Sequence, residues 1–175
     1  MPLRPFNFHQ WVEEHRHLLR PPVGNKQVFL RNDDFIVMVV GGPNARKDYH
    51  YDESEELFYQ IEGDIVLRII EDGKPVEIPI RQGEVFLLPP RVPHSPQRPS
   101  NTIGLVIERY RSKEEKDGCL WFCEQCHNKL HEIYFDLGNI ETQLPIVMKE
   151  FYDSLDLRTC QACGAVMEPP MKKSE

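Results

Sequence analysis

The sequence predicts an all-β body with a short N-terminal helix and a small cysteine-rich extension. Short apolar runs rich in β-branched and aromatic residues recur between residues 28 and 110, and turn-forming residues separate them. Four of the five cysteines then form two Cys-x-x-Cys pairs late in the chain. The 175 residues suit one domain with a small appendage. We therefore expect residues 1–110 to form the body with its helix, and residues 111–175 to form the extension.

The first predicted element is a helix that starts at Asn7, whose side chain can cap it, and ends at Pro21 and Pro22. Its apolar side recurs every three or four residues and comprises Trp11, Val12, His15, Leu18 and Leu19. This one-sided pattern predicts that the helix lies on a larger body.

Six strands are predicted from the apolar runs of the body. They span residues 35–40, 57–61, 65–70, 76–80, 84–88 and 103–108. Turn pairs such as Gly41-Gly42, Gly63-Asp64 and Asp72-Gly73 separate them. Short strands that alternate with turns are typical of an antiparallel sandwich or barrel.

The extension begins with residues 111–118, a charged stretch that we interpret as solvated and as the domain boundary. A helix is predicted over residues 139–155, where apolar residues recur near helical spacing and Pro145 disturbs the centre. The extension is therefore expected to be a small module with one cysteine pair on each side of a helix.

The charge and hydropathy of the chain argue against several classes of protein. Lys and Arg number 21 against 28 Asp and Glu, a net charge of −7, which disfavours a nucleic-acid-binding surface. The apolar run 35–40 is far shorter than the roughly 18 residues of a membrane span. The first twenty residues carry charges and no apolar core of a secretory signal. We expect a cytoplasmic protein that binds neither nucleic acid nor membrane.

Candidate metal ligands lie in two polar stretches of the body. The spacings Glu56-x6-Gly63 and Gly83-x5-Pro89-x-Arg91-x2-His94-x3-Arg98 resemble the two motifs of the cupin barrel, whose metal ligands come from the ends of opposed strands. Cupins commonly carry His-x-His before the glutamate, whereas Asp52 takes the place of the second histidine here. The ligand set is thereby reduced to His50, Glu56 and His94.

Two imidazoles and one carboxylate on one face of a metal leave about three coordination positions open, as in non-haem Fe(II) oxygenases. Substrate and oxygen can then bind side by side. The alternative is that His50 and His94 are ordinary, partly buried polar residues.

Two arginines each lie four residues from a candidate histidine. Residues separated by an even number share one face of a strand, so Arg46 and Arg98 are expected to enter the cavity with the histidines. A buried guanidinium needs an anionic partner, and its planar fork suits a carboxylate. The cavity should therefore bind a carboxylate or a reduced oxygen species.

An ion pair within the chain is the alternative for these arginines. The candidate partners are Asp48, Asp52, Glu55 and Glu108. Glu108 ends an apolar run and, if it projects inward, could instead accept hydrogen bonds from amine or hydroxyl groups of a substrate.

Longer strings resemble one enzyme family. GGPNARKDYH, EELFYQIEGD, FLLPPRVPHSPQRP and LVIER, with PPVGNKQ near the start, are similar to the 3-hydroxyanthranilate 3,4-dioxygenases over essentially the whole body. The late Cys-x-x-Cys pairs resemble the single-cupin bacterial and fungal members, whereas animal members resemble a fused double cupin without those cysteines. Members of the family form homodimers, so the resemblance implies a dimer.

The resemblance also implies roles for particular residues. The implied Fe(II) ligands are His50, Glu56 and His94; the implied catalytic and substrate-binding residues are Arg46 (placing dioxygen), Glu56, Arg98 and Glu108, with Asn25 and Pro96 flanking the pocket. Both oxygen atoms would enter 3-hydroxyanthranilate and open its ring between carbons 3 and 4. The product would be 2-amino-3-carboxymuconate semialdehyde, which cyclises to quinolinate, for NAD synthesis or for catabolism.

The two cysteine pairs are Cys123/Cys126 and Cys160/Cys163, with 33 residues between them. They predict a tetrahedral all-thiolate site for Zn or Fe, structural because four protein ligands leave no position for substrate. The family resemblance implies a rubredoxin-like iron site that ring opening does not need. Disulfides or inert thiols are the alternative, and His127 could replace one cysteine. Cys119 has no assigned role.

Two other functions stay open at this point. The chain could be a non-catalytic cupin that senses an aromatic acid, with the four-cysteine module as a protein or nucleic-acid contact. Residues 119–168 carry only Lys129, Lys149 and Arg158 as cations, which argues against nucleic acid. The chain could also be a cupin isomerase or another dioxygenase that uses Zn or Mn.

Overall fold

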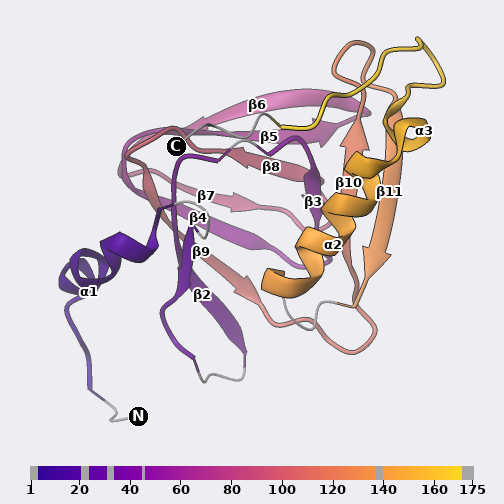
Figure 1. The fold of residues 1–175 in the computed structure, drawn as a ribbon. Helices are drawn as coiled ribbons and strands as arrows, with labels where there is room; N and C mark the ends of the chain where they lie inside the picture. The colour runs from indigo at the N-terminus through magenta and orange to yellow at the C-terminus, as the bar shows by residue number, and fades with distance from the viewer. Residues whose placement is uncertain (1–3, 21–23, 31–33, 45, 137–139, 171–175) are drawn as a thin grey trace.

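The computed structural model describes residues 4–20, 24–30, 34–44, 46–136 and 140–170, which form two antiparallel sheets with helices at opposite ends of the molecule (Figure 1). The first sheet has the order β1 (Asn25–Gln27), β2 (Phe35–Gly41), β9 (Ile103–Arg109), β4 (Glu56–Glu62) and β7 (Val85–Leu88). The second has the order β11 (Lys129–Phe135), β10 (Asp117–Phe122), β3 (Tyr49–Tyr51), β8 (His94–Gln97), β5 (Ile65–Glu71) and β6 (Lys74–Ile80). This architecture confirms the prediction of an all-β cupin barrel.

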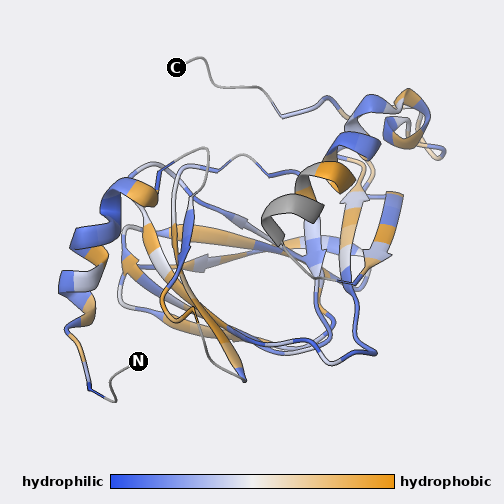
Figure 2. Cartoon of the chain, turned by 60° about the horizontal axis from the view of Figure 1, so that its bottom comes forward, coloured by the Kyte–Doolittle hydropathy of each residue, from blue (hydrophilic) through white to orange (hydrophobic). Residues whose placement is uncertain are grey.

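The core of the barrel forms where the two sheets face each other. Phe58 and Val106 of the first sheet pack with Leu67 and Ile69 of the second in one buried cluster. Hydrophobic residues are concentrated on the strands of the barrel (Figure 2). Burial alternates along β4 and β5, where the first, third and fifth side chains are buried, as expected when one face of a strand points to the core. The polar residues that share the inner face at the strand ends therefore point into the same interior.

The N-terminal helix lies on the outer face of the first sheet. Helix α1 (Phe8–His15) is capped by Asn7, whose side chain accepts a hydrogen bond from the amide of Gln10 at 3.0 Å, and η1 (Arg16–Leu18) follows it. Val12 and Leu19 pack against Val39 of β2. The predicted cap and docking are confirmed, whereas Pro21 and Pro22 lie outside the described residues.

The C-terminal region continues the second sheet. Strand β10 pairs with β3 of the barrel and with β11, and α2 (Ile140–Asp153) covers this hairpin, followed by α3 (Leu155–Arg158). The rings of Trp121 and Phe151 stack with centroids 4.2 Å apart. Helix α2 is continuous through Pro145, so the expected disturbance is wrong. The division at residue 110 stays a prediction, since the sheet runs across it.

All six predicted strands are present, with ends shifted by at most two residues. Five further strands carry no clear apolar alternation and were not predicted: β1, β3, β8, β10 and β11. The interpretation of residues 111–118 as solvated is correct for Ser112, Lys113, Glu114 and Lys116, which are exposed. It is wrong at the two ends of the stretch, because Arg111 is 7% exposed at its side chain and Asp117 is fully buried. No helix among the described residues has the length and hydropathy needed to cross a bilayer.

Candidate active site

Three strands bring together the two histidines and the glutamate predicted as metal ligands. His50 of β3 and His94 of β8 are cross-strand partners with ring centroids 5.2 Å apart, and Glu56 begins β4 in the opposite sheet. One ligand atom from each of the three lies within 4.8 Å of the others. Neighbouring short strands in one sheet, facing the start of a strand in the other, therefore build the cluster that the motif spacing predicted.

The Glu56 carboxylate has an oxygen that suits a cation. Oε2 lies 2.8 Å from Nε2 of His94, an ion pair if the imidazole is protonated, and it is buried without a hydrogen bond among the described atoms. Nδ1 of His94 lies 3.0 Å from the carbonyl oxygen of Val92, which can only accept, so the neutral ring keeps its lone pair on Nε2. The two lone-pair atoms fit a shared metal ion.

The charges of this pair support the same conclusion. Although burial favours the neutral form of both groups, the charge of Glu56 raises the pKa of His94 and the charge of His94 lowers the pKa of Glu56. A positive charge beside Glu56 is therefore favourable, and either a proton or a metal ion can supply it.

His50 is held by residues that the sequence analysis did not predict as part of the site. Its Nε2 lies 2.7 Å from Oδ1 of Asp117, the first residue of β10. Asp117 in turn accepts hydrogen bonds from Arg111, at 2.6 Å to Oδ1 and 2.9 Å to Oδ2. Sequence analysis missed both residues because they lie in a charge-rich stretch whose composition resembles a solvated loop.

The inner faces of β4 and β9 form a surface whose polarity changes along the strands. Their register pairs Glu56 with Glu108, Phe58 with Val106, and Gln60 with Gly104. The carboxylates therefore lie at the histidine end, an apolar floor follows, and Gln60 and Gly104 lie at the far end. Such a surface suits a flat ring that carries polar groups at its edge.

Arg98 occupies the far end of this surface and has no carboxylate partner among the described residues. It is 3% exposed, and its nearest side-chain partner is Oε1 of Gln60 at 3.4 Å from Nη1. Burial lowers the pKa of Arg98 to about 10, and the charge of Glu56 opposes this only in part. A buried and unpaired guanidinium of this kind calls for an anion.

Two residues that sequence analysis missed shape the Arg98 pocket. A Cβ at Gly104 would lie 2.8 Å from Nη1 of Arg98 and 2.7 Å from Oε1 of Gln60, so only glycine leaves room for the guanidinium. Asn44 fixes the backbone: its Oδ1 accepts from the amide of Arg98 at 2.9 Å, and its Nδ2 donates to the carbonyl oxygen of Pro96 at 2.8 Å. The motif strings contain Asn44, but spacing alone gives it no role.

Glu108 lies at the histidine end of the cavity and is almost fully buried. Burial, followed by the nearby charge of Glu56, raises the pKa of Glu108 to about 7. Nη1 of Arg111 opposes this shift and donates to Oε2 of Glu108 at 2.6 Å. Glu108 is thus a buried carboxyl that can accept a hydrogen bond or hold a proton near neutral pH.

Arg46, unlike Arg98, pairs within the chain. Its Nε lies 3.2 Å from both carboxylate oxygens of Asp48, and Nη2 also donates to Asp48. Although burial opposes it, the charge of Asp48 raises the pKa of Arg46. The guanidinium lines two hollows outside the core, of about 420 and 520 Å³, the larger also lined by Met148 and Tyr152 of α2.

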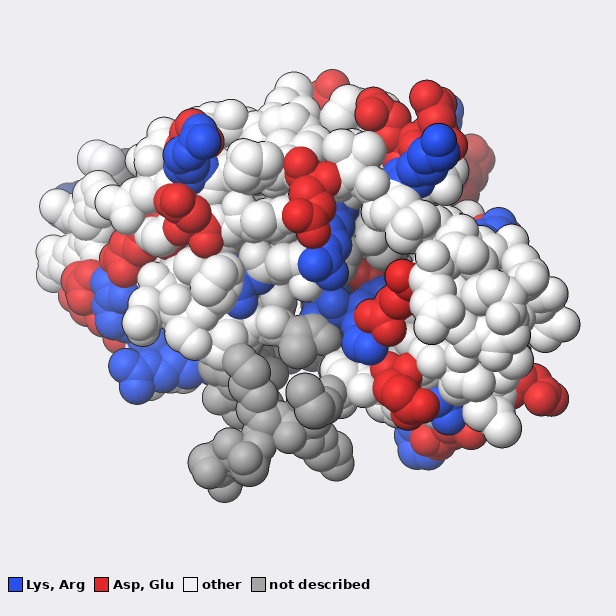
Figure 3. Space-filling model, turned by 90° about the horizontal axis from the view of Figure 1, so that it is seen from above, with Lys and Arg blue, Asp and Glu red and all other residues white. Residues whose placement is uncertain are grey.

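The smaller of these hollows does not offer a free cation. Its basic residues pair with carboxylates: Arg46 with Asp48, Lys47 with Glu124, and Arg68 with Glu77. On the face seen in Figure 3, acidic and basic side chains are likewise intermixed. Asn25 lies half-buried in β1, and Pro96 in β8 pairs with Leu67, so both border the barrel.

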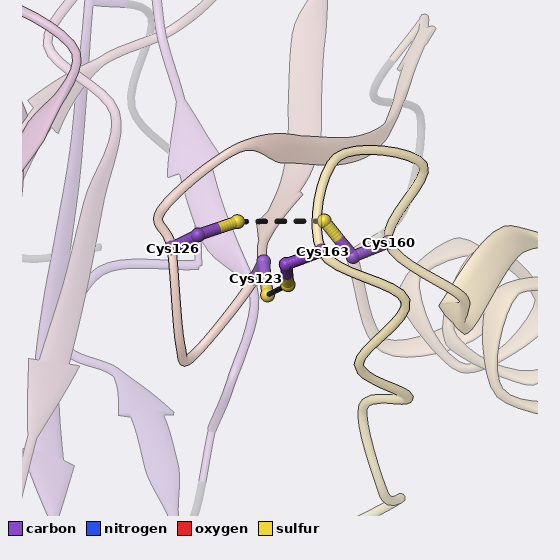
Figure 4. Close-up of side chains that lie close together, drawn as sticks. All are labelled: Cys123, Cys126, Cys160 and Cys163. Atoms are coloured by element: carbon purple, nitrogen blue, oxygen red, sulfur yellow. Dashed lines mark hydrogen bonds between the residues drawn. The ribbon is translucent and has the colours of Figure 1, made fainter.

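The four predicted cysteines form a second cluster at the end of the β10–β11 hairpin (Figure 4). Sγ of Cys123 lies 3.6 Å from that of Cys163, and Sγ of Cys126 lies 3.5 Å from that of Cys160. These spacings approach the roughly 3.8 Å between sulfurs of a tetrahedral thiolate site with metal bonds of about 2.3 Å. All five cysteines are free of disulfides.

Two matching turns build the four-cysteine cluster. The carbonyl oxygen of Cys123 accepts from the amide of His127, and that of Cys160 accepts from the amide of Gly164. His127 and Gly164 occupy the same place with positive φ values of 62° and 75°. His127 therefore ends a turn, and the ligand group consists of the four cysteines. The amide of Cys163 lowers the pKa of Cys160 to about 6, which favours the thiolate form that metals bind.

The comparisons with known proteins identify the family of this chain. The family model of 3-hydroxyanthranilic acid dioxygenase matches residues 1–152. Proteins named 3-hydroxyanthranilate 3,4-dioxygenase include one from Xanthomonas oryzae pv. oryzae strain MAFF 311018, 58% identical over 97% of this chain and 96% of its own. Those from Xanthomonas campestris pv. campestris strain B100 and Jannaschia sp. strain CCS1 are 60% and 50% identical, over 95% and 96% of this chain and 93% and 95% of theirs.

Among solved structures, a cupin-2 domain containing protein from Shewanella frigidimarina NCIMB 400 has a TM-score of 0.48 and 19% identity, and covers 60% of this chain and 94% of its own. The family match extends through the barrel, the β10–β11 hairpin and most of α2. The chain belongs to the 3-hydroxyanthranilic acid dioxygenase family.

Proposed function

We propose that the protein is an Fe(II)-dependent 3-hydroxyanthranilate 3,4-dioxygenase. The observation that carries this proposal is the buried Arg98, which lacks a carboxylate partner among the described residues and faces the His50, Glu56 and His94 cluster across an apolar floor. A flat aromatic acid that carries a carboxylate and metal-binding groups on neighbouring ring carbons can meet Arg98 and the cluster together. Family membership supports the same substrate.

Three residues would hold Fe(II): His50, Glu56 and His94. The fit rests on the unpartnered Oε2 of Glu56 beside the lone pair of His94, and on a donor set of two imidazoles and one carboxylate. Iron held there would supply open coordination positions for the ortho amine and hydroxyl of the substrate and for dioxygen, and a route for electron density from the ring to oxygen. The ligand atoms of His50, Glu56 and His94 lie close enough together to bind one ion.

The other residues of the cavity would orient the substrate and handle its protons. Arg98 would pair bidentately with the carboxylate, and Phe58 and Val106 would lie against the ring face. Glu108, with a pKa of about 7, would accept a hydrogen bond or proton from the hydroxyl or amine. Arg46 would assist dioxygen once free of Asp48, and Asn25 and Pro96 would flank the pocket.

The overall reaction adds one dioxygen molecule to 3-hydroxyanthranilate and breaks the bond between ring carbons 3 and 4. Both oxygen atoms stay in the product, 2-amino-3-carboxymuconate semialdehyde, so atoms and electrons balance without an external reductant. Cyclisation of this product to quinolinate needs no enzyme. Whether the chain serves NAD synthesis or catabolism, its homodimeric state and its cytoplasmic location are further proposals from the sequence and the family resemblance.

The four-cysteine cluster would bind iron or zinc in a structural role. Its four sulfurs complete a tetrahedral set, which leaves no position for substrate. The proposal therefore assigns all ring-opening chemistry to the barrel.

A metal-substitution assay tests the proposed function. Protein stripped of metal and loaded anaerobically with Fe(II), Mn(II) or Zn(II) is mixed with 3-hydroxyanthranilate in aerobic buffer. Formation of the semialdehyde, followed by its absorbance, and uptake of oxygen should occur only with Fe(II). The amount of oxygen consumed should equal the amount of semialdehyde formed. Full turnover by the stripped or zinc-loaded protein would reject the proposal, and substrate binding without turnover in the iron form would favour a sensor.

A further inference from the structure

Arg111 links a candidate metal ligand, His50, and a candidate substrate-binding residue, Glu108, through one guanidinium. It follows β9, its side chain is 7% exposed, and it reaches three buried carboxylates. Nε and Nη2 bind Asp117 as a two-pronged fork, Nη1 donates to Glu108, and Nη2 lies 3.2 Å from Oδ2 of Asp52. Such a fork fixes the orientation of a carboxylate as well as its charge.

Asp117 carries this constraint to the metal cluster. Its Oδ1 meets both Nη2 of Arg111 and Nε2 of His50, at 2.6 and 2.7 Å. The imidazole of a metal ligand is commonly oriented by a carboxylate that binds its other ring nitrogen. The plane of His50 is therefore set by a carboxylate that Arg111 itself holds.

Glu108 carries the same constraint to the substrate side. Its Oε2 is 2.6 Å from Nη1 of Arg111, and its register partner on β4 is the candidate ligand Glu56. Asp52 completes the surroundings of the guanidinium and is itself fixed by the amide and hydroxyl of Ser54, at 2.9 and 2.8 Å. Arg111 can thus turn only if several buried contacts break together.

We propose, resting on the function proposed above, that Arg111 is a positioning residue for ring opening. It orients Glu108 by direct contact, and it orients His50 indirectly, through Asp117. The orientation of the candidate metal ligand His50 and the position of Glu108, the proposed hydrogen-bond acceptor for the substrate, then both depend on one side chain of the β9–β10 connection. Arg111 touches neither metal nor substrate in this account.

Three variants separate the two arms. Arg111→Lys keeps the charge and loses the fork, Arg111→Met removes both, and Asp117→Asn weakens the His50 arm while leaving Glu108 its partner. Arg109→Met is the matched control, because the neighbouring Arg109 is 45% exposed and binds Glu115 outside the cluster. Each protein is measured for thermal unfolding, for Fe(II) affinity by chelator competition without substrate, for anaerobic binding of 3-hydroxyanthranilate, and for kcat and KM.

Fe(II) affinity should fall about 10- to 100-fold in Arg111→Lys and in Asp117→Asn, the usual effect of removing a group that orients a metal ligand. Substrate affinity of the iron-saturated protein should fall several-fold in Arg111→Lys but stay within about twofold in Asp117→Asn, while Arg109→Met matches the wild type throughout. If Arg111→Met does not fold, the lysine variant still decides.

Folded Arg111→Lys protein that keeps wild-type Fe(II) affinity, substrate affinity and kcat, or differs only in its unfolding temperature, would overturn the proposal. Wild-type protein that binds iron in the barrel but does not open the ring would refute the proposed function instead. The metal-affinity comparison would still test the His50 arm in that case.

Discussion

The two metal-capable clusters of this chain differ in donor number, donor type and surroundings. The barrel cluster has three donors, two imidazoles and a carboxylate, on three strands of a packed core, and buried charges surround it. The cysteine cluster has four sulfurs on two similar turns, and two of its residues are exposed. Three donors leave room for substrate and oxygen, whereas four complete a tetrahedron.

This contrast teaches that solvent exposure does not mark the reactive site. The cluster that we propose as reactive is the buried one, where burial would strengthen the interactions of Glu56, Glu108 and Arg98 with a bound ligand and exclude water. The exposed cluster lies at a hairpin end, where a closed metal site can join two loops without a large core. Substitutions in the two clusters should therefore have separate consequences.

The largest effect on turnover is expected from Glu56→Ala. Loss of the carboxylate removes a ligand and leaves His94 without its partner, so turnover should fall by at least about 10⁴-fold, the scale reported for loss of an essential catalytic group. Metal analysis should show one equivalent fewer per chain, with the cysteine metal retained. Wild-type turnover in this variant would show that the barrel cluster is not the reactive one.

Arg98→Ala is expected to have the next largest effect. Truncation removes the cation proposed to meet the substrate carboxylate, so substrate binding should weaken by about 2 to 5 kcal/mol. Anaerobic titration of the iron-loaded protein measures the dissociation constant, and the exposed Arg91, replaced by alanine, is the control. Unchanged substrate affinity and turnover would reject the role of Arg98.

Gly104→Ala should act mainly by displacing Arg98 and its neighbour Gln60. The added Cβ would overlap Nη1 of Arg98 and Oε1 of Gln60 at 2.8 and 2.7 Å, so the guanidinium must move. A displacement of about 1 Å lowers rates up to about 100-fold, and we expect kcat/KM to fall about 10- to 100-fold with Fe(II) affinity unchanged. Combining it with Arg98→Ala should add little, and full additivity would contradict the shared mechanism.

Cys160→Ser should have little effect on chemistry. It removes one ligand of the closed cluster, so the unfolding temperature should drop by about 5 °C or more, while turnover per barrel iron stays within about twofold. Calorimetry and the absorbance assay measure the two quantities. A loss of turnover as large as that in Glu56→Ala would contradict this prediction, because it would show that turnover also needs the cysteine cluster.

The smallest expected effect is the chemical modification of the buried Cys119 thiol. It is fully buried on β10, and burial, followed by the charge of Asp48, raises the pKa of its thiol to about 12. Because the thiolate is the reactive form, only about one part in 10⁴ exists at pH 8, and reactivity should rise only as the pH approaches 12. Peptide mapping after iodoacetamide treatment of native protein at pH 8 should find Cys119 unmodified, and rapid labelling would contradict its burial.

Motif spacing and periodicity predicted much of the fold and the donor atoms. The six apolar strands follow from alternation, and the three barrel ligands and four cysteines follow from spacing. Strands β3 and β8 are too short and too polar for alternation to reveal, although they carry His50 and His94. Their pairing depends on long-range contacts within the sheet, which a local pattern does not contain.

The residues around the donors were harder to predict for the same reason. Arg111 and Asp117 belong to a charged stretch whose burial arises only when β10 pairs with β3. Gly104 matters because a guanidinium from β8's end lies over it, a relation between distant segments. Even-numbered spacing placed Arg98 in the core, whereas for Arg46 the alternative, an ion pair with Asp48, is the one found.

Nitric oxide binding to the iron-loaded protein, followed by electron paramagnetic resonance, tests the central claim most directly, because nitric oxide reports an open position on Fe(II). The account predicts a nitrosyl signal that 3-hydroxyanthranilate alters, that persists in Cys160→Ser, and that disappears in His94→Ala. A signal that survives in His94→Ala, or that the substrate leaves unchanged, would contradict an open iron site in the barrel.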